Sequence, residues 1–237
     1  MNENPLPIEH RKAISRKGYA LLLMALLSLA GCSPSGEARN ASSAGSAAEP
    51  STPLPFSESS TIFEIIPDES QARFLIDEIF WGDEKTVFGQ TGKVTGQLGV
   101  DFADLSTAAA GPIQVNARTL ETDNGYRNRA IQNQVLLTRI YEFVTFTPTA
   151  VKGLPENSQI GEPLTFQIEG DLTITAYTQP ATFEVTAVPL SESRIEGKAR
   201  TTINRGDFEL FVPDATNVAA VAEEVILELD FVATATD

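Results

Sequence analysis

Histidine and cysteine are almost absent from the sequence. Of 237 residues, one is histidine, His10, and one is cysteine, Cys32. A single cysteine excludes a scaffold of intramolecular disulfides, and a single histidine excludes metal sites built from several imidazoles. Glycine and proline, at 16 and 14 residues, are too few for a collagen-like or low-complexity chain. The composition is that of a soluble globular chain of one domain or two.

Basic residues are also scarce, with 17 lysines and arginines against 32 aspartates and glutamates. A chain this acidic has few cations with which to displace the counterions of nucleic acid, and anionic lipid surfaces repel it. We therefore expect no nucleic-acid partner. The expected ligand is neutral, apolar or another protein.

Long apolar runs are limited to one, Gly18–Ala30, which follows Arg11, Lys12, Arg16 and Lys17. A helix of about thirteen residues is too short to cross a hydrocarbon core of about 30 Å. A basic leader followed by a short apolar run is typical of a secretory signal peptide. The sequence therefore predicts export.

The apolar run ends in Leu29-Ala30-Gly31-Cys32, which resembles the lipobox of bacterial lipoproteins, where the cysteine receives a diacylglycerol before cleavage. Two acyl chains would anchor the protein firmly, at roughly 0.8 kcal/mol per buried CH₂. The alternative is an ordinary signal peptide with a cysteine by chance. We expect residues 1–32 to be a lipoprotein signal peptide with lipidation at Cys32. Because Ser33 is not the inner-membrane retention aspartate, we expect the periplasmic side of the outer membrane, or the outer face of a single membrane.

Removal of residues 1–31 would leave 13 basic and 30 acidic side chains and no histidine. Catalytic sites that use histidine as a base, and sites with histidine ligands to zinc, copper, iron or haem, are then excluded. The acid pairs Asp68/Glu69 and Glu223/Glu224 are adjacent, so on strands they face opposite ways and form poor catalytic dyads. We expect no catalytic residue, no metal, no cofactor and no enzymatic activity.

Residues 33–60 are rich in serine, alanine, proline and glycine, and Leu54 and Phe56 are their only large apolar side chains. Such a segment cannot bury a core, so we expect a disordered tether.

Residues 61–237 alternate apolar and polar side chains with a period of two, which is typical of antiparallel strands with one wet face. The alternation is clearest in Lys93–Phe102, Leu164–Ile174, Ala181–Ala187, Ile195–Ile203 and Val225–Ala233, and weaker in Thr61–Ile66, Gln71–Phe80, Ile113–Leu120 and Phe143–Val151. One helix is expected at Gly125–Leu137, after the capping residues Thr122-Asp123-Asn124. The predicted fold is all-β, an antiparallel up-and-down, lipocalin-like barrel of about eight strands with one short α-helix.

Four landmarks follow in order along this domain. They are the opening FEIIPDESQARFLI, the pair Arg127–Ile131 and Tyr141–Phe146, the segment Gly170–Ile174 with Thr178-Gln179-Pro180, and Ile203–Phe208. In this order they resemble the YceI-like family of exported bacterial barrels, over essentially Thr61–Ala233. The resemblance implies a lipocalin-like barrel that binds isoprenoid or other long-chain lipids. The chain departs from the family pattern at Glu69, Asn128, Glu142, Thr175 and Ala176.

An eight-stranded barrel is either filled by its own side chains or holds one small ligand, and the size of the inward residues decides which. Glycine and alanine alternate with phenylalanine on the expected inner faces. These residues fill a core or leave an apolar tunnel, and the resemblance implies the tunnel. The residues predicted to line it are Phe74, Ile76, Val115, Phe146, Phe166, Ile168, Gly170, Phe183, Val185, Ala199, Leu227 and Phe231.

Four further residues are candidates for contacts with a ligand head group. Tyr126, Arg127 and Arg129 form a local basic excess, which would meet a phosphate or carboxylate head or pair with acids of the barrel. Arg205 would grip a head group at the barrel mouth, or form a structural ion pair with Asp207. Trp81 is expected either at the rim of a ligand portal or in the core, with the core favoured.

The predicted function is that of an exported, membrane-anchored lipoprotein that binds or carries an isoprenoid or other long-chain lipid in an apolar lumen. The alternative is a non-catalytic envelope interaction or stress-related module with a filled barrel. The size of the interior distinguishes the two.

Overall fold

The computed structural model describes residues 52–216 and 218–236 of the chain. The predicted signal peptide, Cys32 and most of the predicted tether lie outside the described residues. No helix within the described ranges has the length and apolarity needed to span a bilayer. At the end of the predicted tether, Phe56 packs over Gly99 and Gly111, so contacts with the domain begin before the predicted boundary at Thr61.

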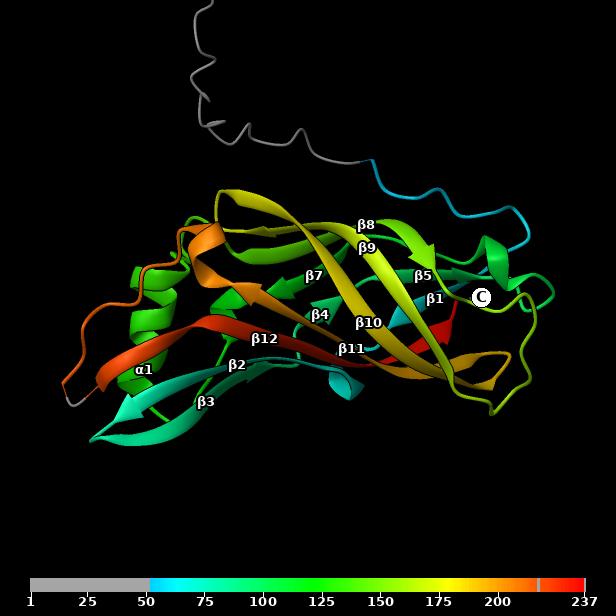
Figure 1. The fold of residues 1–237 in the computed structure, drawn as a ribbon. Helices are drawn as coiled ribbons and strands as arrows, with labels where there is room; N and C mark the ends of the chain where they lie inside the picture. The colour runs from blue at the N-terminus through cyan, green and yellow to red at the C-terminus, as the bar shows by residue number, and fades with distance from the viewer. Residues whose placement is uncertain (1–51, 217, 237) are drawn as a thin grey trace, which may run out of the picture. The chain divides into compact units, whose positions relative to one another are not determined.

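Twelve antiparallel strands form one sheet in the described residues, and the sheet curls around an apolar interior (Figure 1). The strands are β1 (Thr61–Ile65), β2 (Gln71–Phe80), β3 (Asp83–Thr91), β4 (Val94–Thr95), β5 (Gln97–Val100), β6 (Ala109–Ala110), β7 (Ile113–Asn116), β8 (Phe143–Lys152), β9 (Leu164–Ile174), β10 (Tyr177–Ser191), β11 (Arg194–Asn204) and β12 (Val218–Ala235).

The strand order is β4-β7-β8-β9-β10-β11-β12-β1-β5-β6, and β2 pairs with β12 and β3. β4 and β5 belong to one predicted strand that is interrupted at Gly96. The Ile65 N–H donates to the Gly96 carbonyl at 3.0 Å, so β1 meets this interruption and the two ends of the sheet approach each other. The predicted antiparallel, barrel-like β fold is confirmed. The predicted number of about eight strands is too low, because the run at Lys93–Phe102 divides and β3 and β6 were not predicted.

The last strand, β12, is the longest and connects the two halves of the sheet. From Glu224 to Thr234 it pairs with β11, while its other edge pairs first with β2 and then with β1. The register with β2 shifts between Val221 and Val225, which is a bulge. One strand therefore has both β1 and β2 as neighbours.

The predicted helix is confirmed at its start, where Asn124 caps α1 (Gly125–Ala130) by accepting hydrogen bonds from the Tyr126 and Arg127 amides. From Ile131 the predicted continuation is a π-helix, η4 (Ile131–Val135), and Leu137 follows with φ of 48°. The remaining short turns are the 3₁₀ helices η1 (Pro67–Glu69), η2 (Leu105–Thr107), η3 (Ala117–Thr119) and η5 (Arg205–Phe208). Gln90 and Glu121 exchange backbone hydrogen bonds, which join β3 to the segment before α1.

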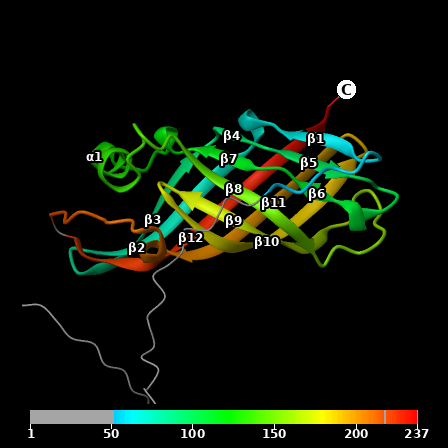
Figure 2. The ribbon, with the colours of Figure 1, turned by 90° about the horizontal axis from the view of Figure 1, so that it is seen from above.

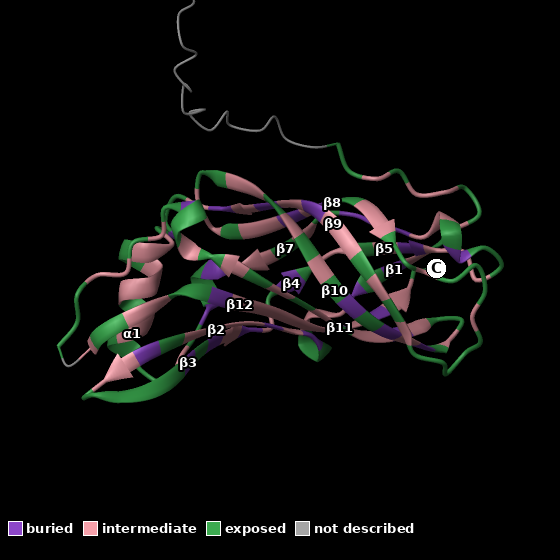
Figure 3. Ribbon diagram, viewed as in Figure 1, coloured by how far each residue is buried: buried purple, intermediate pink, exposed green. Residues whose placement is uncertain are grey.

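The buried hydrophobic residues form two clusters that share partly buried neighbours such as Ile113 and Phe183. The first surrounds Phe63, Val185 and Phe231, and the second contains Phe146, Leu172 and Phe208. Figure 3 shows where buried residues lie along the strands. Burying each such side chain contributes about 1.5 to 3 kcal/mol, so the interior rather than the surface stabilises the curled sheet.

Candidate ligand-binding cavity

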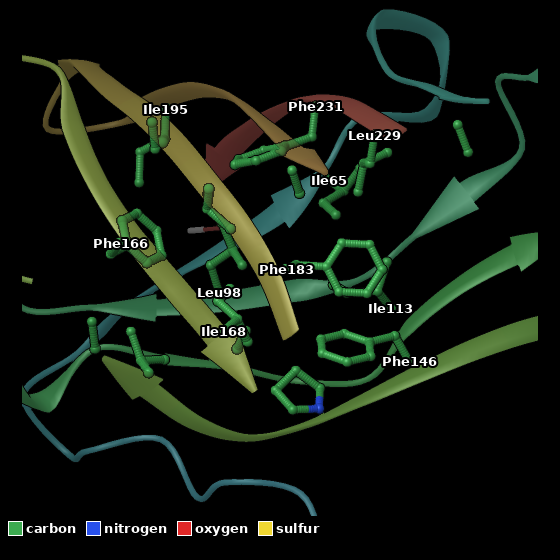
Figure 4. Close-up of a pocket in the computed structure, with 18 of the residues that line it drawn as sticks. Ile65, Leu98, Ile113, Phe146, Phe166, Ile168, Phe183, Ile195, Leu229 and Phe231 are labelled. Atoms are coloured by element: carbon green, nitrogen blue, oxygen red, sulfur yellow. The ribbon is translucent and has the colours of Figure 1, made fainter. Parts of the chain in front are cut away.

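The interior of the sheet contains a cavity of about 220 Å³. Of the 33 residues that line it, 31 are apolar, and they come from strands around the whole curl as well as from loops. Figure 4 shows their side chains converging from opposite strands, with Phe146 and Phe183 close together. The interior is therefore not completely filled by its own side chains.

Two charged residues, Arg73 and Glu228, complete the lining. They are cross-strand neighbours on β2 and β12, and the Arg73 guanidinium lies 3.5 Å from the Glu228 carboxylate. Phe74 and Leu227, the next residues on the same strands, also line the cavity. Because successive side chains of a strand point to opposite faces, the two charges belong to the outer face and the cavity presents an apolar surface.

Glycines in the wall provide room for the phenylalanine rings. A Cβ on Gly170 would lie 2.8 Å from Phe146 Cζ, and a Cβ on Gly197 would lie 2.5 Å from Phe231 Cζ. Gly89 is covered in the same way by Phe74. Glycine in a strand marks close approach by another group, and here the group is an aromatic ring on a neighbouring strand. The rings therefore pack against the wall, which leaves the centre open.

Ten of the twelve predicted lumen residues line the cavity. They are Phe74, Val115, Phe146, Phe166, Ile168, Phe183, Val185, Ala199, Leu227 and Phe231. Ile76 does not, because it lies farther along β2 than Phe74, next to Val87 and Val225. Gly170 does not either, because the ring of Phe146 covers it.

Sequence reasoning missed the lining residues that come from loops. Leu105 of η2 and Leu154 of the β8–β9 connection reach the cavity, and the Leu105 N–H donates to the Glu156 carbonyl at 3.3 Å. Neither leucine lies in an alternating run, so the sequence carried no signal for them.

None of the predicted head-group residues lines the cavity. Arg127 pairs with two carboxylates, those of Asp123 and of Glu78, the latter at 3.1 Å. The Arg129 guanidinium lies 4.6 Å from the ring centroid of the exposed Tyr126. The structure thus shows Arg127 paired with a barrel acid, which was one of the two alternatives.

Arg205 has a structural role, but with a partner other than the expected Asp207. Its guanidinium pairs with Glu223 and donates to the backbone carbonyls of Ala222 and Leu210, at 3.0 and 3.1 Å. These bonds join η5 to the start of β12. The favoured prediction for Trp81 is wrong: its side chain is 71% exposed at the β2–β3 turn and lies outside both the core and the cavity.

An ionic network lies beyond the cavity, where the inner face of β2 meets α1. Glu78 is the buried carboxylate of this network, and its register partner on β3 is Lys85. Lys85 donates to Asp123 at 3.2 Å, and this hydrogen bond, together with the nearby Arg127 charge, holds the Asp123 pKa below its ordinary value. The network fastens α1 to the β2–β3 hairpin.

In the part of the chain that the structure describes, no group of three or more histidine, cysteine, aspartate or glutamate side chains is arranged to hold a metal ion.

Solved structures show the same fold at low identity. BcnA of Burkholderia cenocepacia aligns with a TM-score of 0.59 and 18% identity, over 72% of this chain and 99% of its own. A polyisoprenoid-binding domain from Saccharophagus degradans implicated in plant cell wall breakdown aligns with a TM-score of 0.57 and 14% identity, over 73% of this chain and 98% of its own. The YCEI protein of Campylobacter jejuni aligns with a TM-score of 0.53 and 15% identity, over 63% of this chain and 85% of its own.

No curated protein matches the sequence significantly. A family model for the YceI-like domain matches residues 63–233, which is most of the chain and nearly all of the curled sheet. The chain therefore belongs to the YceI-like domain family.

Proposed function

We propose that this domain binds the hydrocarbon chain of an isoprenoid or another long-chain lipid in its cavity. The observation that carries the proposal is the lining, in which 31 of 33 residues are apolar. Transfer of a hydrocarbon chain from water to such a surface is favourable by about 25 cal/mol per Å² of apolar area. The relative from Saccharophagus degradans, described as a polyisoprenoid-binding domain, supports the same ligand class.

The size of the cavity limits what it holds. Its volume of about 220 Å³ is below the range of about 300 to 1,000 Å³ that is usual for sites of drug-sized ligands. We therefore expect the cavity to enclose a segment of the chain and the remainder to extend beyond it. Recognition of a segment without polar contacts tolerates different chain lengths, so a range of apolar chains should bind.

The proposed role is binding without catalysis. The charged groups of the two titratable lining residues, Arg73 and Glu228, lie on the outer face of the sheet, where they pair with each other. An apolar surface of this kind offers no general acid or base to a bound hydrocarbon chain.

The test uses the domain alone, residues 52–237. BcnA and the Saccharophagus domain align over 99% and 98% of their own chains, and over 72% and 73% of this chain. Proteins that consist of this domain alone therefore adopt the fold, and we expect residues 52–237 to do the same. Native mass spectrometry of the domain purified from a bacterial host should show a discrete added mass, which organic extraction identifies as a lipid. Titration with cis-parinaric acid, a fluorescent fatty acid, should show saturable uptake. A native mass equal to that of the protein alone, together with no uptake of cis-parinaric acid, would contradict the proposal.

We also propose that Cys32 carries a lipid anchor and that the domain lies on the outer side of a bacterial membrane, at the outer membrane if the cell has two. The support is the order of basic residues, apolar run, small residues and cysteine in residues 11–32. Metabolic labelling with a radioactive fatty acid should mark the full chain, and Cys32→Ser should lose the label and leave the membrane fraction. A labelled Cys32→Ser protein would disprove the assignment.

A further inference from the structure

Large apolar side chains are exposed mainly at one end of the sheet. At this end, which we name the α1 end, strands β2, β9 and β11 finish, β8, β10 and β12 begin, and α1 packs beside the β2–β3 hairpin (Figures 1 and 2). Of the ten exposed large apolar side chains among the described residues, seven lie here. They are Trp81, Tyr126, Leu137, Ile140, Phe143, Tyr177 and Phe211.

Contacts between the connections show that these segments are neighbours. Val218, which ends the loop that carries Phe211, is the register partner of Phe80 beside Trp81. Arg127 of α1 pairs with Glu78 on the same hairpin. The Tyr177 hydroxyl donates to the Glu209 carboxylate, two residues before Phe211. The connections that carry the exposed side chains therefore meet at the α1 end.

Backbone strain is concentrated at the same end. All four described non-glycine residues with positive φ lie in its connections: Trp81, Leu137, Thr175 and Glu209. In the β8–β9 connection at the opposite end the positive-φ positions are glycines, Gly153 and Gly161, which adopt this conformation without strain. Trp81 is at once strained and 71% exposed. The two-residue turn between Phe80 and Asp83 requires positive φ, but the exposure of the Trp81 ring does not stabilise the fold, and strained residues often lie at functional surfaces.

The α1 end also carries arginines that have no carboxylate partner. Within the described residues twelve side chains are basic, and ten of them form ion pairs; Arg129 and Arg139 do not. Both lie in residues 125–141, which contain no aspartate or glutamate in a chain with 32 of them. Both arginines are exposed, and Arg129 lies against the exposed Tyr126 ring. Such cations near exposed apolar side chains match a surface that offers phosphate groups above an apolar layer.

We propose that the α1 end docks on a phospholipid bilayer, with Trp81, Tyr126, Ile140 and Phe211 inserted at the interface and Arg129 and Arg139 at the phosphates. Tryptophan and tyrosine are the side chains enriched at that depth of a membrane. The exposed side chains lie on separate connections. A fluid bilayer can accommodate side chains at such separate positions, whereas a protein partner would need a surface of complementary shape. Asp83, Glu84 and Asp214 lie at the same end, so insertion and not long-range attraction drives the docking.

The test measures partitioning of the domain, residues 52–237, into vesicles of pure phosphatidylcholine. Trp81 is the only tryptophan of the chain and reports its own insertion. We expect co-flotation with the vesicles, a blue shift of the tryptophan emission and quenching by brominated lipids. Addition of phosphatidylglycerol should not strengthen binding, because the domain is acidic.

A matched pair of triple variants tests the location. Tyr126→Ser/Ile140→Ser/Phe211→Ser keeps the reporter and should weaken partitioning by at least about tenfold, since each serine removes an exposed apolar side chain from the interface. Phe88→Ser/Ile160→Ser/Leu190→Ser removes three side chains, each about half exposed, away from the α1 end and should leave partitioning unchanged. Far-UV circular dichroism establishes that both variants are folded.

Three outcomes would overturn the proposal. The first is that the folded domain does not float with vesicles. The second is that the control triple variant lowers partitioning as much as the α1-end triple variant. The third is that the α1-end triple variant abolishes a dimer in solution while the domain does not bind vesicles. The proposal does not depend on lipid in the cavity. If the purified domain carries no bound lipid and still floats with vesicles, the cavity proposal fails and the docking proposal stands.

Discussion

Phe231 of β12 lies over Gly197, its register partner on β11. A side chain at Gly197 would meet the ring on one side and the Thr186 carbonyl oxygen at 2.8 Å on the other. The Phe231 ring therefore occupies space that a side chain at position 197 would fill. Because the ring lies against the wall, it leaves the interior open.

Gly197→Ala should displace the Phe231 ring toward the cavity and strain β11. We expect a loss of about 1 to 3 kcal/mol in the free energy of unfolding, as for other overpacked sites, and weaker uptake of cis-parinaric acid. Urea denaturation and the probe titration measure the two effects. Gly125→Ala is the control, since no atom lies within 4 Å of a Cβ there. Equal stability of the two variants would show that the ring has another place to go.

Ala199→Phe should fill the cavity, because Ala199 lines it and a phenyl group occupies much of its volume of about 220 Å³. We expect a folded protein that takes up cis-parinaric acid at least about tenfold more weakly, since the apolar surface is no longer available to the probe. Thr202→Phe adds the same ring at an exposed position on the same strand and serves as the control. Unchanged uptake by Ala199→Phe would place the ligand elsewhere.

Arg127→Ala should destabilise the domain more than the loss of an ordinary surface ion pair. Glu78 is only 7% exposed, so removal of Arg127 leaves a buried carboxylate without its main partner, at a cost of about 2 to 3 kcal/mol. Arg200→Ala, which breaks an exposed pair with Glu228, should cost less than about 1 kcal/mol. Glu78→Gln in the Arg127→Ala background should restore part of the stability. Equal unfolding midpoints for Arg127→Ala and Arg200→Ala would contradict this ranking.

Acid should loosen the attachment of α1. The Lys85 hydrogen bond and the Arg127 charge lower the Asp123 pKa below 3.8, so this carboxylate stabilises the folded state above that pH and ceases to do so as the pH falls through its folded pKa. Because Asp123 is largely exposed, the contribution is a few tenths of a kcal/mol. The stability advantage of the wild type over Asp123→Asn should therefore be constant near neutral pH and vanish in strong acid. Urea midpoints across this range measure it, and an advantage that persists in strong acid would exclude the carboxylate as its source.

The alternation of side chains predicted much of the sheet. β2 and β9 have the predicted bounds, because their apolar faces point to a buried interior and their polar faces to solvent. β3 was not predicted, since it begins with Asp83-Glu84-Lys85 and alternates poorly. The predicted strand through Gly96 divides where Ile65 bonds to that glycine, an interaction between segments far apart in the sequence.

The cavity was predictable in the strands and not in the connections. Inward positions such as Phe166 and Val185 follow from the period of two, whereas Leu105 and Leu154 reach the cavity through loops whose path depends on tertiary contacts. The partners of the arginines were beyond sequence reasoning for the same reason. Arg127 meets Glu78, 49 residues away, and Arg205 meets Glu223 on another element in place of the nearby Asp207.

The position of β12 sets the timing of assembly. Since β1, β2 and β11 all pair with this final strand, a growing polypeptide that lacks residues 218–235 has no strand between β11 and its first two strands. Contacts of such long sequence separation form slowly. The wall of the cavity, which includes Leu227, Leu229 and Phe231 of this strand, is thus incomplete until synthesis of the domain is nearly finished.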